Sequence, residues 1–192
     1  NGYLLGDIAL TKPVKISGKG RGVVLKAKAG TNKLFTIRSS QVEISGLLIY
    51  MHNTASGAVT FYLDTAALAL EHIYLRDLLV WNAFAVLRDA ASSSNVIVNL
   101  HLSDVLCTYN RGVAIHLTDA FAYTYFKNVT VDNVPSGQLG IPVNFAGIVI
   151  ENAQGIFFEN CDINGGNGYA GGDGFVIKNS AAVYFDACMS DT

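Results

Sequence analysis

The sequence is poor in charge and has no long apolar run, and these two shortages limit its partners. Charged residues make up 15% of the chain, and the formal net charge is −2. This balance provides no electrostatic attraction to nucleic acid or to an anionic membrane. No apolar run approaches the ~20 residues that cross a bilayer, and no signal-peptide pattern opens the chain. We therefore expect neither a nucleic-acid partner nor insertion into a membrane.

Cysteine is also scarce, and its spacing does not indicate a metal. Cys107, Cys161 and Cys188 form no Cys-x-x-Cys or Cys/His pattern of the kind that binds zinc. All three fall on apolar positions, where a free cysteine behaves as a small buried hydrophobe. Cys161 and Cys188 share one position of the repeat described below, so a bridge between them is conceivable. We expect buried thiols, no metal site and no cofactor.

The chain is rich in one pattern, a nonapeptide that occurs six times. Each copy reads apolar–x–apolar–x–small–apolar–x–apolar–x, and Ser190 is the one break in the last apolar column. The third positions are separated by 31, 27, 24, 32 and 27 residues. A variable period with alternation inside each unit is typical of stacked β coils. These third positions are Ile44, Leu75, Leu102, Phe126, Phe158 and Phe185.

A pentapeptide with the same alternation precedes each nonapeptide. We expect it to form the first strand of each coil, and the two halves of the nonapeptide to form the second and third, with the small residue at the corner. The sequence thus predicts an all-β, right-handed parallel β-helix of about seven coils. It would be a single domain over residues 1–192, with an irregular opening coil at 1–30 and six regular coils at 31–192. Because the chain lacks an initial Met and stops after a complete nonapeptide, we expect a fragment of a longer β-helix. The third residues of the pentapeptides are Ile37, Leu63, Leu87, Leu117, Ile150 and Ile177.

Alternation also predicts which side chains face outward. The second strands direct a row of rings to the outside, which predicts contact with sugars or with another protein surface. The third strands direct leucines outward near the N-terminal end, and such an apolar stripe predicts association. The ring positions are Tyr74, His101, Tyr125, Phe157 and Tyr184, and the apolar stripe contains Leu48, Leu79 and Leu106, with Trp81 two places further on.

The strand pattern resembles the pectin-lyase-like β-helix superfamily over essentially the whole chain. The opening segments Tyr3–Leu10 and Val14–Leu25 are similar to the first coils of bacteriophage tailspikes and related polysaccharide depolymerases. This resemblance implies an extracellular homotrimer on a virion tail. It further implies that the protein binds and cuts a bacterial capsular or O-antigen polysaccharide, with the ring row binding glycan and the leucine stripe joining subunits.

Glycoside hydrolysis needs two carboxylates that flank the scissile bond. The exposed candidates are Asp64, Glu151 and Asp173. The last lies in Gly171–Lys178, which is similar to the polygalacturonase-type Gly-Asp-Asp-x-Ile-x-Ile-Lys, although Gly172 replaces the first Asp and no Gly-His-Gly follows. Glu151 and Asp173 occupy different places along neighbouring strands, an offset of roughly 16 Å at ~3.3 Å per residue. They are therefore too far apart to act as a pair.

Two alternatives to hydrolysis remain open. Elimination needs a base and cations that neutralise a uronate carboxylate, and Tyr62, Arg88 and His116 on consecutive coils could supply them. A binding or structural β-helix, such as an adhesin segment or a catalytically silent tailspike, would use the rings without cleaving the glycan. We favour hydrolysis over elimination as the initial hypothesis.

Overall fold

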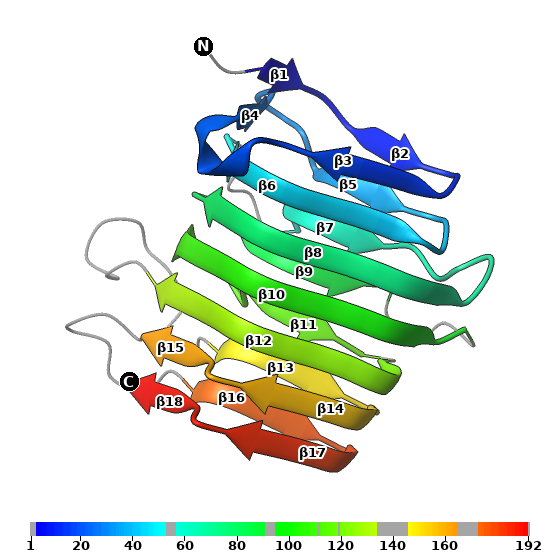
Figure 1. The fold of residues 1–192 in the computed structure, drawn as a ribbon, viewed down its shortest axis with the longest axis vertical. Helices are drawn as coiled ribbons and strands as arrows, with labels where there is room; N and C mark the ends of the chain where they lie inside the picture. The colour runs from blue at the N-terminus through cyan, green and yellow to red at the C-terminus, as the bar shows by residue number, and fades with distance from the viewer. Residues whose placement is uncertain are drawn as a thin grey trace.

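The computed structural model is a stack of coils with two parallel β-sheets on opposite sides of a shared core (Figure 1). It describes residues 3–52, 57–90, 95–110, 112–118, 120–133, 146–164 and 173–191. The chain rises through these coils as a right-handed parallel β-helix, with its two ends at opposite ends of the stack. The described residues contain one short 3-10 turn, η1 (Gly20–Gly22), and no helix long enough to cross a membrane.

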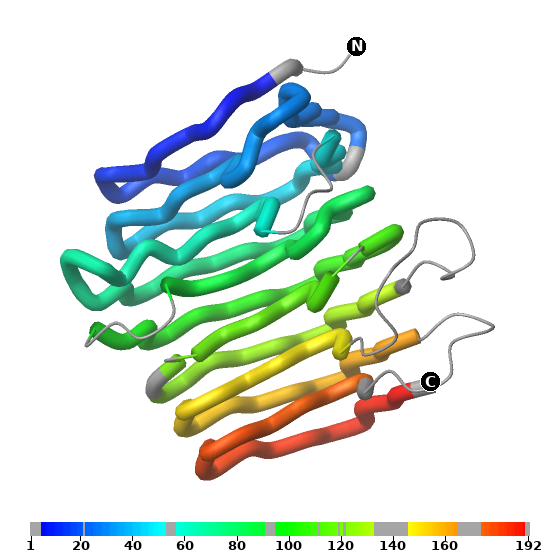
Figure 2. The backbone as a smooth tube through the Cα atoms, turned by 180° about the vertical axis from the view of Figure 1, so that it is seen from behind, coloured from blue at the N-terminus to red at the C-terminus, as the bar shows by residue number. Residues whose placement is uncertain are grey.

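Sheet B contains one strand from each coil, and Figure 2 shows it from behind. Its seven strands follow one another in space in the order in which they occur along the chain. They correspond to the predicted pentapeptides, with one further strand from the opening coil. The strands are β2 (Ile8–Leu10), β5 (Lys33–Ile37), β7 (Val59–Leu63), β9 (Ala85–Asp89), β11 (Ile115–Leu117), β13 (Ala146–Glu151) and β16 (Asp173–Lys178).

Sheet A contains the eleven remaining strands. In the middle coils the two halves of each nonapeptide form one long bent strand, whereas the first and last coils divide it in two. The bent strands are β6 (Val42–Tyr50), β8 (Leu70–Trp81), β10 (Ile97–Asn110) and β12 (Phe121–Asn133). The others are β1 (Tyr3–Leu5), β3 (Val14–Ser17), β4 (Val24–Ala27), β14 (Gln154–Glu159), β15 (Asp162–Asn164), β17 (Ala181–Asp186) and β18 (Met189–Asp191).

The bend in each long strand falls on the predicted small residue. All six of these corner residues have a left-handed backbone, which Gly, Asn and Asp adopt most readily. The corners also join neighbouring coils, because Asn128 Nδ2 donates to Asp104 Oδ1 at 2.8 Å and Asn160 Nδ2 donates to Asn128 Oδ1 at 2.9 Å. The same bend in every coil lets the strands turn without losing their partners. The φ angles are 66° at Gly46, 49° at Asp77, 55° at Asp104, 52° at Asn128, 50° at Asn160 and 49° at Ala187.

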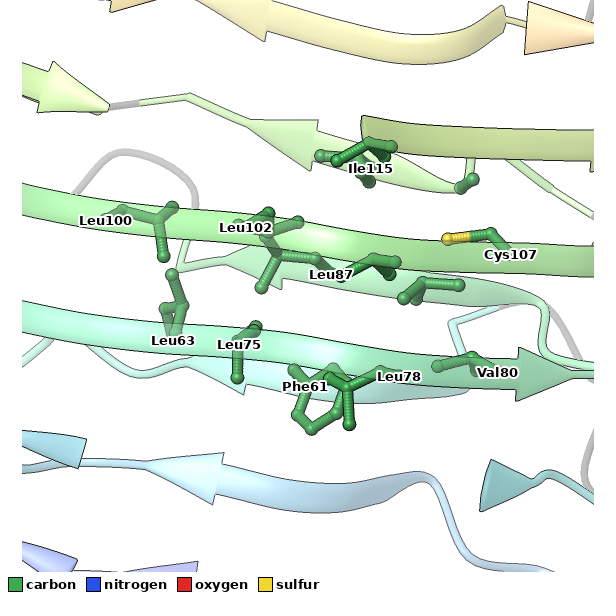
Figure 3. Close-up of a cluster of buried hydrophobic side chains, with 14 of the residues drawn as sticks. Phe61, Leu63, Leu75, Leu78, Val80, Leu87, Leu100, Leu102, Cys107 and Ile115 are labelled. Atoms are coloured by element: carbon green, nitrogen blue, oxygen red, sulfur yellow. The ribbon is translucent and has the colours of Figure 1, made fainter. Parts of the chain in front are cut away.

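The core lies between the sheets and is continuous along the stack. Figure 3 shows Leu75 and Leu102 of sheet A facing Phe61, Leu63 and Leu87 of sheet B. The predicted nonapeptide register is confirmed at every coil, since all six third positions pair in sequence. Similar side chains therefore stack on one another, which fills the core without gaps between coils.

The predicted register of the pentapeptides is wrong at one coil. Leu63 pairs with Asp89 and not with Leu87, so this strand is shifted by two residues. Asp89 tolerates an inward position because its carboxylate accepts hydrogen bonds from Thr118 N at 2.8 Å and from Thr118 Oγ1 at 3.1 Å. The shift aligns Arg88 with Tyr62.

The three cysteines are free thiols, as predicted, but they differ in burial. Cys107 and Cys161 are buried, and burial raises the pKa of each thiol to about 12. Cys188 is only half-buried because it lies on the last described coil, where no further described strand covers it. The two buried thiols should therefore react slowly with thiol reagents, since the thiolate is the reactive form.

Candidate functional site

The outer face of sheet A carries five stacked rings, which we call the aromatic column. The rings lie on consecutive strands and pair in register, as predicted. Neighbouring centroids are 4.8–5.0 Å apart, and the ring planes differ by only 9–23°. From the N-terminal end, the members are Tyr74, His101, Tyr125, Phe157 and Tyr184.

Stacking determines which part of each ring can touch a ligand. The faces of the three inner rings are covered by their neighbours, so mainly ring edges and polar tips are available. Tyr184 is the last ring of the column and is 56% exposed. Burial, aided by the nearby His72, lowers the pKa of His101, which keeps the imidazole neutral at pH 7. The column thus offers a neutral, amphipathic wall.

The aromatic column forms one side of a groove of about 740 Å³, which we call the sheet A groove. The opposite side is a second outward row, two residues further along each strand. Lys127 donates to Glu159 at 2.6 Å, which raises the pKa of the ammonium group, and Arg76 pairs with Glu43. These charges are paired with each other, so the groove has little net charge to attract an ionic ligand. The second row consists of Arg76, Ser103, Lys127, Glu159 and Asp186.

Sequence reasoning identified only one side of this groove. The second row occupies the fourth position of each nonapeptide, so reading that position down the six copies would have revealed it. Its alternating charge hid it, because mixed charges on a strand face usually mark ordinary solvated surface.

The outer face of sheet B carries a different row, Tyr62–Arg88–His116, which we call the cationic column. These residues pair directly on consecutive strands. The ammonium of Lys33 lies 3.3 Å from the centroid of the Tyr62 ring. Arg88 Nε and His116 Nε2 are both shielded from solvent and lack a hydrogen-bond partner. The column therefore contains two nitrogens that no described hydrogen-bond partner satisfies, and a ligand would reach them only if neighbouring side chains moved.

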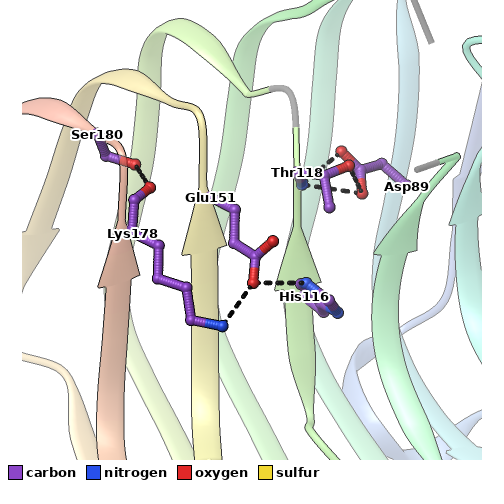
Figure 4. A network of polar contacts seen from close by, with 6 residues as sticks. All are labelled: Asp89, His116, Thr118, Glu151, Lys178 and Ser180. Carbon is purple, nitrogen blue, oxygen red and sulfur yellow. Dashed lines mark hydrogen bonds and ion pairs between the residues drawn. The ribbon is translucent and has the colours of Figure 1, made fainter. Parts of the chain in front are cut away.

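Glu151 borders the cationic column and is already engaged (Figure 4). Its Oε1 accepts a hydrogen bond from Lys178 at 2.9 Å, which lowers the pKa of the carboxyl group. His116 Nε2 lies 3.8 Å from the same oxygen, too far for a hydrogen bond. Burial lowers the pKa of His116 and raises that of Tyr62. Near neutral pH the imidazole is therefore uncharged and the phenol keeps its proton.

The three carboxylates proposed for hydrolysis lie apart from one another. Asp64 is bound to Arg38 at 2.7 Å and follows β7, three strands from Glu151, which places them ~14 Å apart at ~4.8 Å per strand. Asp173 pairs with Ala146, five residues before Glu151. Both separations exceed the ~9.5 Å upper limit for a glycosidase pair. Gly171 and Gly172 of the Gly-Asp motif lie outside the described residues.

The leucine stripe lies in register on the third-strand limb of sheet A. Leu48, Leu79 and Leu106 pair on consecutive strands and are half-buried by their neighbours. Trp81 lies two residues beyond Leu79 and is 41% exposed. We call the three leucines the strand-three face, and Trp81 lies beside it. Among the described residues, no group of three acidic, histidine or cysteine side chains is placed to hold a metal ion.

By architecture, then, the chain is a parallel β-helix with a groove on one sheet and a cationic column on the other. Comparisons with protein-family models, with curated proteins and with solved structures found no match. The sheet A groove and the cationic column are therefore the two surfaces that indicate a function.

Proposed function

We propose that the protein is an extracellular, tailspike-like β-helix that binds a bacterial capsular or O-antigen polysaccharide along the sheet A groove. The observation that carries the proposal is the unbroken aromatic column beside a polar row over five coils. Coils repeat every ~4.8 Å, close to the advance of one sugar in an extended glycan, so each sugar would meet the same pair of rows. A repeating surface suits a repeating ligand.

The covered ring faces define how such a glycan would bind. Sugars would contact ring edges and tyrosine hydroxyls, and the opposite row would hydrogen-bond to their hydroxyl groups. Because Lys127 is already paired with Glu159, and Arg76 with Glu43, the groove favours a glycan of low charge density. Binding energy would come from many modest hydrogen bonds along the groove.

Removal of one tyrosine hydroxyl should weaken glycan binding and leave the column stacked. Tyr125→Phe is expected to lower affinity about 2- to 10-fold, which corresponds to the loss of one hydrogen bond. Isothermal titration calorimetry with a panel of capsular and O-antigen polysaccharides measures this. Tyr123→Phe is the matched control, since Tyr123 lies on the same strand and is 57% exposed but does not line the groove. Equal affinities for both variants and the parent would refute the groove as the binding site.

We propose elimination on sheet B as the cleavage reaction, because Arg88 and His116 lie side by side with unsatisfied nitrogens. Arg88 would neutralise the carboxylate of a uronate. Neutral His116 would accept the proton α to that carboxylate, a carbon–carbon double bond would form, and the bond to the glycosidic oxygen would break. The Tyr62 hydroxyl would donate a proton to the leaving oxygen. Hydrolysis by Asp64, Glu151 or Asp173 would instead need a second carboxylate from another subunit.

The elimination hypothesis predicts both a product and a pH dependence. Burial lowers the pKa of His116 below its usual 6.5, so the neutral base forms, and the rate rises, as pH increases through a value below 6.5. Arg88→Gln should lower kcat/KM at least 100-fold, whereas Arg38→Gln, which removes a cation outside the column, should change it little. The rise in ultraviolet absorbance of the unsaturated uronate measures the rate on a panel of capsular and O-antigen polysaccharides that contain uronate. Reducing ends released without this absorbance would indicate hydrolysis, and no cleavage at all would indicate a binding protein.

We also propose that the chain assembles as a homotrimer on a virion tail through the strand-three face. Support comes from the uncharged character of that face over three coils, where Leu48, Leu79 and Leu106 lie in one row. The face becomes polar further along, at Thr130 and Asp162, which would limit contact to the N-terminal half.

A further inference from the structure

A tyrosine occupies a backbone position that rarely suits it. Tyr109 has a φ of 55°, in the left-handed region that a bulky residue seldom adopts. Thr108 pairs with Trp81, so the equivalent residue one coil earlier is Asn82, which has a φ of 60°. Asparagine is well suited to this conformation and tyrosine is not. Such strain at an exposed residue is a reason to look for a function.

The strained backbone holds the Tyr109 ring next to Trp81. Their centroids are 5.6 Å apart, and the ring planes open at 34°. On the other side, Tyr50 meets Trp81 at 76°, edge against face. Trp81 is 41% exposed and Tyr109 is 50% exposed. This open wedge differs from the aromatic column, where near-parallel rings cover one another.

The wedge has the chemistry of a sugar-ring site. Aromatic faces attract a ligand surface that carries C–H bonds, and the indole N–H and the phenol hydroxyl provide polar contacts at the rim. Trp81 and Tyr109 are both uncharged, and Lys26, a described cation of the same row, pairs with Tyr50 on the side of Trp81 away from Tyr109. A neutral pyranose has one such C–H face and a polar rim, whereas an acidic sugar would gain no ion pair from either ring.

We propose that Trp81 and Tyr109 form a second carbohydrate site, in which a single neutral pyranose ring rests across the exposed surfaces of both rings. The site lies on the far limb of sheet A, seven residues along β8 from Tyr74, and does not depend on the sheet A groove. It would hold a side branch or a neighbouring chain of the same surface glycan while the groove binds a main chain.

Fluorescence tests this site selectively, because Trp81 is the only tryptophan in the sequence. Cellotriose, mannotriose and galactotriose serve as neutral probes, and trigalacturonate serves as the acidic probe. At least one neutral probe should shift the emission of Trp81 and protect it from acrylamide quenching, and trigalacturonate should do neither. No response to any neutral probe, or an equal response to the acidic probe, would overturn the proposal.

Two variants separate this site from the groove and from subunit contact. Tyr109→Asn restores the residue of the preceding coil, so the fold should persist while the fluorescence response weakens at least tenfold. Tyr125→Phe changes the sheet A groove and not the wedge. It should therefore leave the fluorescence response of Trp81 unchanged, whether or not the groove binds a glycan. An unchanged response in Tyr109→Asn would overturn the proposal. So would an emission shift that depends on protein concentration and follows oligomer formation, which would identify the wedge as a subunit contact.

Discussion

Truncation of Phe158 to alanine is expected to lower the free energy of unfolding by about 3–5 kcal/mol. Phe158 is 1% exposed and stacks on Phe126 at 4.7 Å and on Phe185 at 4.8 Å. Removal of the Phe158 ring would leave a cavity between Phe126 and Phe185. The two sheets cannot close this cavity because the backbone hydrogen bonds between coils fix the spacing of the strands. Chemical denaturation with urea measures the loss.

Phe157 provides the matched control, since it is the adjacent residue and points outward. It stacks on Tyr125 at 4.9 Å and on Tyr184 at 5.0 Å, but no core volume lies behind it. Phe157→Ala should therefore lower the free energy of unfolding by about 1–3 kcal/mol, the value of two ring pairs. Equal losses for the two variants would contradict the division into an inner and an outer row. The dependence of unfolding on urea should be equally steep in both, since the same surface is exposed.

If the proposed trimer forms through the strand-three face, substitution of Leu79 by aspartate should convert it into a soluble monomer. Full burial of a leucine is worth about 1.5–3 kcal/mol per subunit, and the trimer would repeat this gain three times. The Leu79→Asp change would instead place one unpaired carboxylate from each subunit in a contact that excludes water, which strongly disfavours assembly. Sedimentation velocity measures the change in mass.

Thr130→Asp is the control for this experiment. Thr130 pairs with Leu106 and so continues the row of Leu79, but it lies where the row becomes polar. The variant should remain a trimer. If the face is covered within one chain, Leu79→Asp should leave the mass unchanged and destabilise the monomer by several kcal/mol. A parent chain that sediments as a monomer would exclude the interface for this chain.

Sequence reasoning predicted the fold accurately where each coil repeats an apolar side chain. Ile44, Leu75 and Leu102 could be recognised as equivalent positions because each coil must place an apolar side chain at the same point of the core. The register predicted for the strand that contains Asp89 was wrong, because apolar patterning cannot anticipate a buried carboxylate that accepts a hydrogen bond from Thr118. The error of two residues concealed the direct pairing of Tyr62 and Arg88.

The candidate sites were only partly predictable, for a related reason. Alternation identified the ring positions correctly, but it contains no information on ring orientation. Whether a ring offers a face or an edge depends on its tilt relative to the next coil, which differs between Tyr125 and Trp81. The distance between Glu151 and Asp64, by contrast, follows from the sequence, because the two residues share one column and lie three coils apart.

The corner residues limit where the chain can gain or lose residues during evolution. Equivalent positions are separated by 24 to 32 residues, yet the rows remain unbroken from coil to coil. Most of this variation is absorbed in the links between strands, and a little in irregularities near the ends of β10 and β12, between Cys107 and Asn110 and between Phe121 and Thr124. Insertions in the links can diversify the surface at little cost, whereas one extra residue within a strand, without such a bulge, would invert every side chain beyond it. Duplication of a whole coil would lengthen the sheet A groove by ~4.8 Å, so the length of the proposed glycan site and the length of the gene would change together.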